Sequence, residues 1–330
     1  MFYTKKERDT ANYPISLPKD FLFLCRQKGA QQSILAFLFS FIAKKLNYEY
    51  NINNMSLKTY FEVRAKKKFK KKYKVGLCLS GGGTKGFSYI GAFKAFKEFG
   101  VEFDMVAGTS AGSLFGAIYA SKMDLNLIKD MTKGIKNSDF RHSKLGILPS
   151  SMDKLHALIE KVLPVKKAEN LSVPYFAVAV DLKTGKEVHF NSGNLASIIT
   201  GSCASPGVFL PVKYKNMTLI DGGVRNNIPA DVLKMNGCHF VVTIDCNCSR
   251  GGGTSSDKLF TQFSTSVGIM MVNNSKKGTE LSDIIICPDL KKYKSLNLEG
   301  KDEMIKEGYN ATVKMMPEIL KLFSGRYKKR

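Results

Sequence analysis

A serine between two glycines, in the segment GTSAG at residues 108–112, is the side chain whose surroundings most favour chemistry. The segment follows an apolar run and precedes a helical pattern, and a serine on such a sharp strand-to-helix turn is exposed at the edge of a sheet. Gly108 and Gly112 flank it because a side chain at either position would clash with the tight turn. We therefore predict that Ser110 is a nucleophile, and a serine hydroxyl needs a base to take its proton.

Two residues are candidates for that base. Asp221 closes an apolar run in the segment DGG, where Gly222 and Gly223 keep the following turn tight. His239 would give Ser110, Asp221 and His239 the chain order of an α/β-hydrolase triad. His239 opens its expected strand, however, whereas parallel sheets place their active sites at the carboxyl ends of strands. The sequence favours Asp221 as the base and keeps an esterase with the triad as the alternative.

A glycine-rich segment, LSGGGTKGFS at residues 79–88, lies between an apolar run and a helical pattern. Glycine destabilises the interior of strands and helices, so this cluster requires a ligand that approaches the backbone closely. The spacing G-x-G-x-x-G that begins at Gly81 matches the dinucleotide-binding fingerprint, and Glu102 or Asp104 stands near the distance of a ribose contact. A dinucleotide-binding oxidoreductase is therefore one interpretation of this segment.

The other interpretation of the glycine-rich segment is an oxyanion hole. The amides of Gly81, Gly82 and Gly83 would then face the oxygen of a tetrahedral intermediate in acyl transfer. Ser110 follows the next expected strand, in a context where the G-x-S-x-G pattern indicates a nucleophile. This second feature favours the oxyanion hole over the dinucleotide site.

The elements that must position these residues alternate between strands and helices. Strands are expected at 74–80, 103–109, 175–182, 186–190, 218–221, 239–245 and 283–287. Helices are expected at 86–100, 113–123, 152–162, 194–204, 228–236, 257–272 and 300–322. Such alternation predicts a three-layer α/β/α fold whose central sheet is mostly parallel and covered by helices on both faces.

The segments GGGTKG, GTSAG and DGG, in this order, resemble those of the patatin-like phospholipases, as does SCASPGVFLPV at 202–212. The resemblance covers roughly residues 74–245, and the core segments span 79–245. It implies a patatin-like fold and a catalytic dyad of Ser110 and Asp221. It also implies an oxyanion hole in the glycine-rich loop and hydrolysis of fatty acyl esters, phospholipids foremost, through an acyl-enzyme.

The resemblance extends to further residues and to the ligands of the protein. No metal or cofactor is implied, and Asp221 is expected in a partly apolar site that raises its pKa. Lys85 stands where the family often has arginine, which keeps the charge without the planar fork. Lys85 is expected to hold the loop or to contact an anionic head group. The residues that support the three segments are Lys85, Gly86, Gly108, Gly112, Gly222 and Gly223.

Residues 1–73 form an amino-terminal extension that precedes the expected hydrolase domain at 74–330. The apolar segment SILAFLFSFIA at 33–43 is shorter than the about 20 residues of a membrane span, and KKKFKKKYK at 66–74 is polybasic. An apolar helix and a basic patch together predict peripheral contact with an anionic membrane. The alternative is that the apolar helix packs on the domain.

Composition limits the partners and the compartment. The chain is 44% apolar and 24% charged, as in soluble globular proteins, but its net charge of +23 favours an anionic partner. We expect a lipid or phospholipid substrate and a membrane surface rather than nucleic acid. The seven cysteines contain no C-x-x-C, which argues against a disulfide framework or a zinc site and predicts free thiols at Cys246 and Cys248. A cytoplasmic protein is expected, with secretion as an effector left open.

Overall fold

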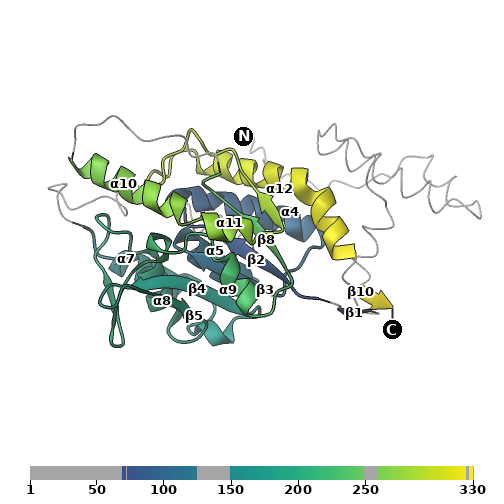
Figure 1. The fold of residues 1–330 in the computed structure, drawn as a ribbon, viewed down its shortest axis with the longest axis horizontal. Helices are drawn as coiled ribbons and strands as arrows, with labels where there is room; N and C mark the ends of the chain where they lie inside the picture. The colour runs from purple at the N-terminus through teal and green to yellow at the C-terminus, as the bar shows by residue number, and fades with distance from the viewer. Residues whose placement is uncertain (1–68, 72, 125–148, 249–258, 325–326, 330) are drawn as a thin grey trace, which may run out of the picture. The chain divides into compact units, whose positions relative to one another are not determined.

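A computed structural model of the chain describes residues 69–71, 73–124, 149–248, 259–324 and 327–329 (Figure 1). These ranges all fall within one compact unit, Glu62–Arg330. The predictions for the apolar segment 33–43 and for most of the amino-terminal extension lie outside the described residues. Within the described ranges, no helix is both long enough and apolar enough to cross a membrane.

The sheet that carries the site has eight strands in the order β6-β7-β4-β3-β2-β8-β9, with β5 paired to β4. Its parallel part consists of β4 (Tyr175–Asp181), β3 (Met105–Thr109), β2 (Val75–Leu79), β8 (Phe240–Ile244) and β9 (Ile284–Ile286). The antiparallel strands are β5 (Lys186–Phe190), β6 (Val212–Tyr214) and β7 (Met217–Asp221). Every residue of β2, β3 and β4 is buried, as expected for apolar runs covered on both faces.

Helices cover both faces of the sheet, so the fold is the expected three-layer α/β/α arrangement (Figure 1). On one face, α9 (Ala230–Met235) packs against Cys78, Ala107 and Val178 in a common core. On the other face, α5 (Ala111–Ala120) lies against Leu79 and Val106. The remaining helices are α4 (Ser88–Phe99), α7 (Asp153–Val162), α8 (Leu195–Cys203), α10 (Leu259–Asn273), α11 (Lys276–Glu280) and α12 (Lys301–Ser324).

The carboxyl-terminal part of the chain contacts the glycine-rich segment. Helix α12 lies along α4 (Figure 1), and the loop that leads into α12 reaches Thr84. The Thr84 amide donates to the Ser295 carbonyl at 2.8 Å, and its hydroxyl donates to the Lys294 and Asn297 carbonyls at 3.0 and 2.8 Å. Residues beyond the expected core segments therefore help to hold the loop.

The structure differs from the expected elements mainly in short pieces. The helix expected from residue 86 begins as a 3-10 turn, Gly83–Phe87, before α4. The polybasic segment contains a strand, β1 (Phe69–Lys71), that pairs with β10 (Tyr327–Lys329). Three-residue strands such as β1, β6 and β10 are too short for a hydrophobic period to reveal.

Candidate active site

Ser110 lies at the junction of β3 and α5 in a conformation that is rare for a residue with a side chain, with φ 54° and ψ −124°. The two flanking glycines make this turn possible. A Cβ atom on Gly108 would lie 2.1 Å from the Gly112 carbonyl oxygen, and one on Gly112 would lie 2.2 Å from the Leu79 carbonyl oxygen. The predicted clash at both positions is thus present, and the strained turn presents Ser110 at the carboxyl end of β3.

A second serine, which sequence reasoning missed, ties this turn to its neighbours. The Ser110 amide donates to Ser202 Oγ at 2.9 Å, and Ser202 Oγ donates to the Val178 carbonyl at 2.6 Å. Ser202 is fully buried in α8. The strained residue is therefore linked through one hydroxyl to a helix and to the neighbouring strand β4.

Strand β4 brings Asp221 to the same place. In the sheet, Thr109 pairs with Val178 on one side of β4, and Asp221 pairs with Ala179 on the other side. Because Val178 and Ala179 are consecutive, the residue after Thr109 and the last residue of β7 stand at the same level of the sheet. The register therefore sets Ser110 and Asp221 on either side of one strand.

The environment of Asp221 suits a base. The residue is 1% exposed, and its Oδ1 accepts a hydrogen bond from the Gly223 amide at 2.8 Å. Its Oδ2 is buried and accepts no hydrogen bond of normal geometry from the described residues, although the Ser110 hydroxyl lies close enough to lower the pKa of the carboxyl. Burial raises the pKa of Asp221 to about 6, and the nearby Ser110 hydroxyl and the Gly223 amide oppose the rise. The rise in pKa expected from the sequence is therefore present, and its cause is desolvation.

The glycine-rich loop offers fewer oxyanion donors than expected. The Gly81 amide donates to the Asn227 carbonyl at 3.1 Å, so the expectation that it faces an oxyanion is not supported. The amides of Gly82 and Gly83 donate to no group in the described part of the chain. Gly83 has φ +59°, and a Cβ there would lie 2.1 Å from the Ser295 carbonyl oxygen. Within the part of the chain that the structure describes, the loop thus keeps two free amides, those of Gly82 and Gly83.

Lys85 belongs to the glycine-rich segment but does not line the cavity. It is 5% exposed. Its charge opposes the effect of burial, which raises the pKa of Asp245. Of the two roles expected for Lys85, this position favours support of the loop over contact with a lipid head group.

Ser110, Asp221 and the glycine-rich loop all line one cavity of about 250 Å³. Most of its wall is apolar and comes largely from α5, α7 and α10 and from the loop at 205–209. Representative side chains are Phe115, Ile118, Leu155, Ile159, Val208 and Met271. A long hydrocarbon chain suits such a lining, and none of the described lysines or arginines lines the cavity.

His239 is not near Ser110. Its Nδ1 accepts a hydrogen bond from the Lys74 amide at 3.3 Å, at the amino end of β8. The five residues of β8 separate it from the carboxyl end of the sheet, a distance of about 17 Å at the usual rise. None of the described histidines lines the cavity, and His142 lies outside the described residues. The structure therefore does not assemble the alternative triad.

The ribose contact proposed for a dinucleotide is also misplaced. Asp104 Oδ2 accepts a hydrogen bond from the Val75 amide at 2.8 Å, which fixes it at the amino end of β2. The glycine-rich loop follows the opposite end of β2. Because a dinucleotide contacts both groups at the carboxyl edge of the sheet, this arrangement does not fit the fingerprint.

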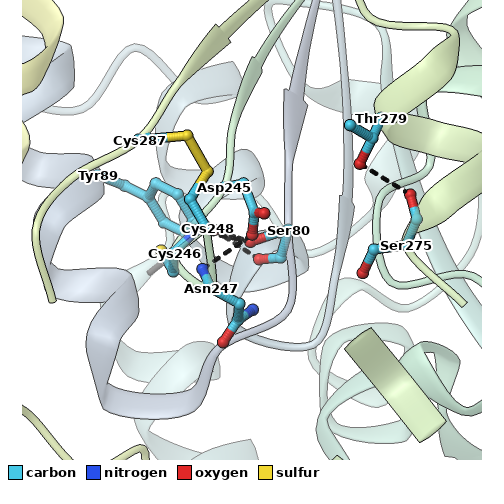
Figure 2. The surroundings of a disulfide bond; sticks show 9 residues. All are labelled: Ser80, Tyr89, Asp245, Cys246, Asn247, Cys248, Ser275, Thr279 and Cys287. Atoms are coloured by element: carbon cyan, nitrogen blue, oxygen red, sulfur yellow. Dashed lines mark hydrogen bonds between the residues drawn. A yellow bond between two sulfur atoms is a disulfide. The ribbon is translucent and has the colours of Figure 1, made fainter. Parts of the chain in front are cut away.

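Cys248 and Cys287 form a disulfide, with their Cα atoms 5.6 Å apart, and this corrects the expectation of a free thiol at Cys248. Figure 2 shows the bond beside Asp245, Cys246 and Asn247. The spacing of the cysteines in the sequence did not reveal this disulfide, because the two partners are 39 residues apart and come together only through the β8–β9 pairing. Cys246 is free and buried, as expected.

Two asparagines of the cavity were also missed from sequence. Asn247 Nδ2 donates to the Gly81 carbonyl at 2.6 Å, and the backbone carbonyl of Asn227 accepts a hydrogen bond from the Gly81 amide. Both asparagines therefore hold the glycine-rich loop. The only feature of the sequence that could have indicated them is their position after a strand of the site. Asn227 follows the DGG segment closely, and Asn247 follows the carboxyl end of β8.

Comparison with known proteins places this site in a family context. Residues 77–234 match the family model described as patatin-like phospholipase. Human patatin-like phospholipase domain-containing protein 6 is 31% identical over 185 residues, covering 52% of this chain and 13% of that protein. An uncharacterised NTE family protein of Mycobacterium tuberculosis is 30% identical over 184 residues, covering 54% of this chain and 51% of that protein. The chain thus spans about half the length of the second relative and far less of the first.

A likeness also exists among solved structures. VipD from Legionella pneumophila is 16% identical and covers 76% of this chain and 70% of its own, with a TM-score of 0.47.

Proposed function

We propose that this chain, whose residues 77–234 belong to the patatin-like phospholipase family, hydrolyses fatty acyl esters of lipids with a serine nucleophile and an aspartate base. One observation carries the proposal. Ser110 on its strained turn and the buried Asp221 open into the same apolar cavity. A nucleophile, a base of raised pKa and a hydrocarbon-lined space are the three parts that this reaction requires.

In the proposed reaction, Asp221 takes the hydroxyl proton of Ser110 as the serine oxygen attacks the ester carbonyl. The Gly82 and Gly83 amides donate hydrogen bonds to the oxyanion that forms. The proton then passes to the leaving alcohol, and the acyl group stays on Ser110. Attack by water on this acyl-enzyme releases the fatty acid and restores the serine. A pKa of about 6 lets Asp221 be ionised at neutral pH yet still return the proton.

The lining of the cavity supports a fatty acyl chain as the part of the substrate that it binds. Phe115 and Ile118 of α5 and Leu155 and Ile159 of α7 contribute hydrocarbon surface. Each methylene that such a surface removes from water adds about 0.8 kcal/mol of binding free energy. Phospholipids are the proposed substrates because the family name points to them and the protein is strongly basic.

Surface residues beside the cavity support peripheral contact with a membrane. Leu296 lines the cavity and is 44% exposed, and Ile269 and Met270 are exposed between lining residues of α10. Lys292 and Lys294, in the loop that carries Leu296, are exposed as well. Apolar and basic side chains together favour an anionic lipid surface.

A lipid panel assayed with the wild type and Ser110→Ala tests the proposal. We expect release of fatty acid from at least one phospholipid by the wild type and none by the variant. A fluorophosphonate probe should label the wild type, and mass spectrometry should locate the label on Ser110. Absence of labelling, together with tight binding of NAD(P), would instead favour the dinucleotide-binding protein.

A further inference from the structure

Asn227 has an orientation that its neighbours determine. Its side chain is 2% exposed, and Nδ2 donates to Ser275 Oγ at 3.2 Å. Ser275 Oγ uses its single proton to bond the Met271 carbonyl at 3.1 Å, so it can only accept from Asn227. Ser275 itself is held at the start of α11, where Thr279 donates to its carbonyl (Figure 2). The amide nitrogen of Asn227 therefore points to Ser275 and its Oδ1 points the other way.

The Oδ1 atom of Asn227 lies near both the glycine-rich loop and the DGG segment. A Cβ placed on Gly81 would be 2.4 Å from this oxygen, and one placed on Gly223 would be 2.9 Å from it. The same Gly223 position lies 3.2 Å from Asp221 Oδ1. Asn227, Asp221 and Ser110 line one cavity. Asn227 Oδ1 is thus close to the carboxylate of the proposed base.

Two buried acceptors without donors belong to residues that line this cavity. Asn227 Oδ1 and Asp221 Oδ2 are buried side-chain oxygens that have no hydrogen-bond donor within the described residues. Buried polar atoms in native proteins almost always have a partner, so each such atom requires an explanation. A small molecule that donates two hydrogen bonds would satisfy both oxygens. Water is the smallest such molecule.

We propose that Asp221 Oδ2 and Asn227 Oδ1 together hold the water molecule that hydrolyses the acyl-enzyme, which makes Asn227 a residue of the second half-reaction. The inference rests on the proposed function. Water donates one hydrogen to each oxygen, which leaves a lone pair of its own oxygen directed at the acyl carbon of Ser110. As the new carbon–oxygen bond forms, Asp221 takes one proton. The tetrahedral intermediate then collapses, the bond from the acyl carbon to Ser110 Oγ breaks, and the proton returns to Ser110 Oγ.

The proposal predicts an effect on one half-reaction only. Acylation does not use the water, so removal of the Asn227 oxygen should slow breakdown of the acyl-enzyme and leave its formation almost unchanged. Misplacement of a reactant by about 1 Å can lower a rate by up to about 100-fold. A residue with a merely structural role would slow both steps together.

The experiment follows p-nitrophenyl butyrate in a stopped-flow instrument, where the initial burst reports acylation and the steady phase reports deacylation. Intact mass spectrometry measures the acyl-enzyme at the same time. We expect Asn227→Ala to accumulate acyl-enzyme, with a deacylation constant about 10- to 100-fold lower. Asn226→Ala is the matched control, because Asn226 is a buried neighbour whose amide bonds Glu187 and Asp231 away from the cavity.

A second variant acts on Asn227 without changing it. Ser275→Ala removes the acceptor that orients the Asn227 amide, and we expect the same change in the ratio of the two constants, by a smaller factor. It decides the question alone if thermal melting shows that Asn227→Ala does not fold. Equal slowing of both steps, or slowing of acylation alone, would overturn the proposal. A wild type that forms no acyl-Ser110 at all would instead overturn the proposed function.

Discussion

The amide of Ser110 donates a hydrogen bond to Oγ of Ser202, and this contact joins the strained turn after β3 to helix α8. The two residues are 92 positions apart in the chain. Ser202 also donates to the Val178 carbonyl, so its hydroxyl satisfies a buried donor and a buried acceptor at once. The geometry of Ser110 therefore depends on a residue outside its own segment.

Ser202→Ala should lower both stability and turnover. The change leaves the Ser110 amide and the Val178 carbonyl without their hydroxyl partner, which costs about 1–3 kcal/mol in the free energy of unfolding. Turnover should fall because the serine loses its fixed direction. Thr200→Val is a suitable control, since the Thr200 hydroxyl is equally buried in α8 but bonds only carbonyls of its own helix. Urea unfolding and ester hydrolysis measure the two effects. Equal behaviour of the two variants would contradict this role of Ser202.

The pKa of Asp221 makes a prediction about stability. Burial raises it to about 6 in the folded protein from an ordinary value of 3.8, so the folded state binds the proton more tightly than the unfolded state. The contribution of this group to stability is complete below about pH 4 and is lost as the pH rises through about 6. Asp221→Asn removes this loss. Relative to the wild type, the variant should gain up to about 3 kcal/mol between pH 4 and pH 8.

Chemical unfolding of both proteins at several pH values measures this difference, and the activity of Asp221→Asn should be nearly absent throughout. A stability difference that does not change with pH would mean that Asp221 is not desolvated in the folded protein.

Gly83→Ala should remove most of the turnover. The backbone there has φ +59°, and the new Cβ would meet the Ser295 carbonyl oxygen at 2.1 Å, so the loop must move and its amides lose their direction. One oxyanion donor is typically worth about 10²–10³ in rate. Gly185→Ala is the control that separates backbone strain from this clash. Gly185 also has a positive φ, +67°, but a Cβ added there has no atom within 4 Å. The prediction is wrong if the two variants have the same kcat.

Reduction of the disulfide should weaken the site as well as the fold. Cys248 follows Asn247, whose side chain bonds the Gly81 carbonyl at 2.6 Å. A bridge over 39 residues stabilises a protein by about 4 kcal/mol at most in the chain-entropy model. A reducing agent should therefore lower the melting temperature and kcat of the wild type. The double variant Cys248→Ser, Cys287→Ser should show both losses from the start and no response to the reductant.

The sequence predicted the parts of this molecule that local patterns determine. Apolar runs identified the parallel strands, and the steric demands of GTSAG and DGG marked Ser110 and Asp221 as candidate site residues. The sheet register then brought these two together across β4. The carboxyl-end rule for parallel strands accounts for the position of Ser110 after β3. It does not account for Asp221, because β7 runs antiparallel to β4 and only the register sets its last residue level with Thr109.

What the sequence did not predict depends on contacts between distant segments. The Gly81 amide donates to the Asn227 carbonyl, and the Ser110 amide donates to Ser202 Oγ. Cys248 bonds Cys287 only because β8 pairs with β9. No local pattern distinguishes these residues from other polar or sulfur-containing side chains. Their roles become visible only when the strands and helices are assembled.

The central claim is that Ser110 acts with Asp221 and without a histidine, and kcat/KM for a short-chain ester across pH 5–9 tests it most directly. In the wild type, kcat/KM should rise with pH through about 6, as Asp221 ionises, and then level off. Asp221→Asn should lose nearly all activity, while His239→Ala should match the wild type because His239 lies at the other end of β8. Substantial activity in Asp221→Asn together with its loss in His239→Ala would contradict the account.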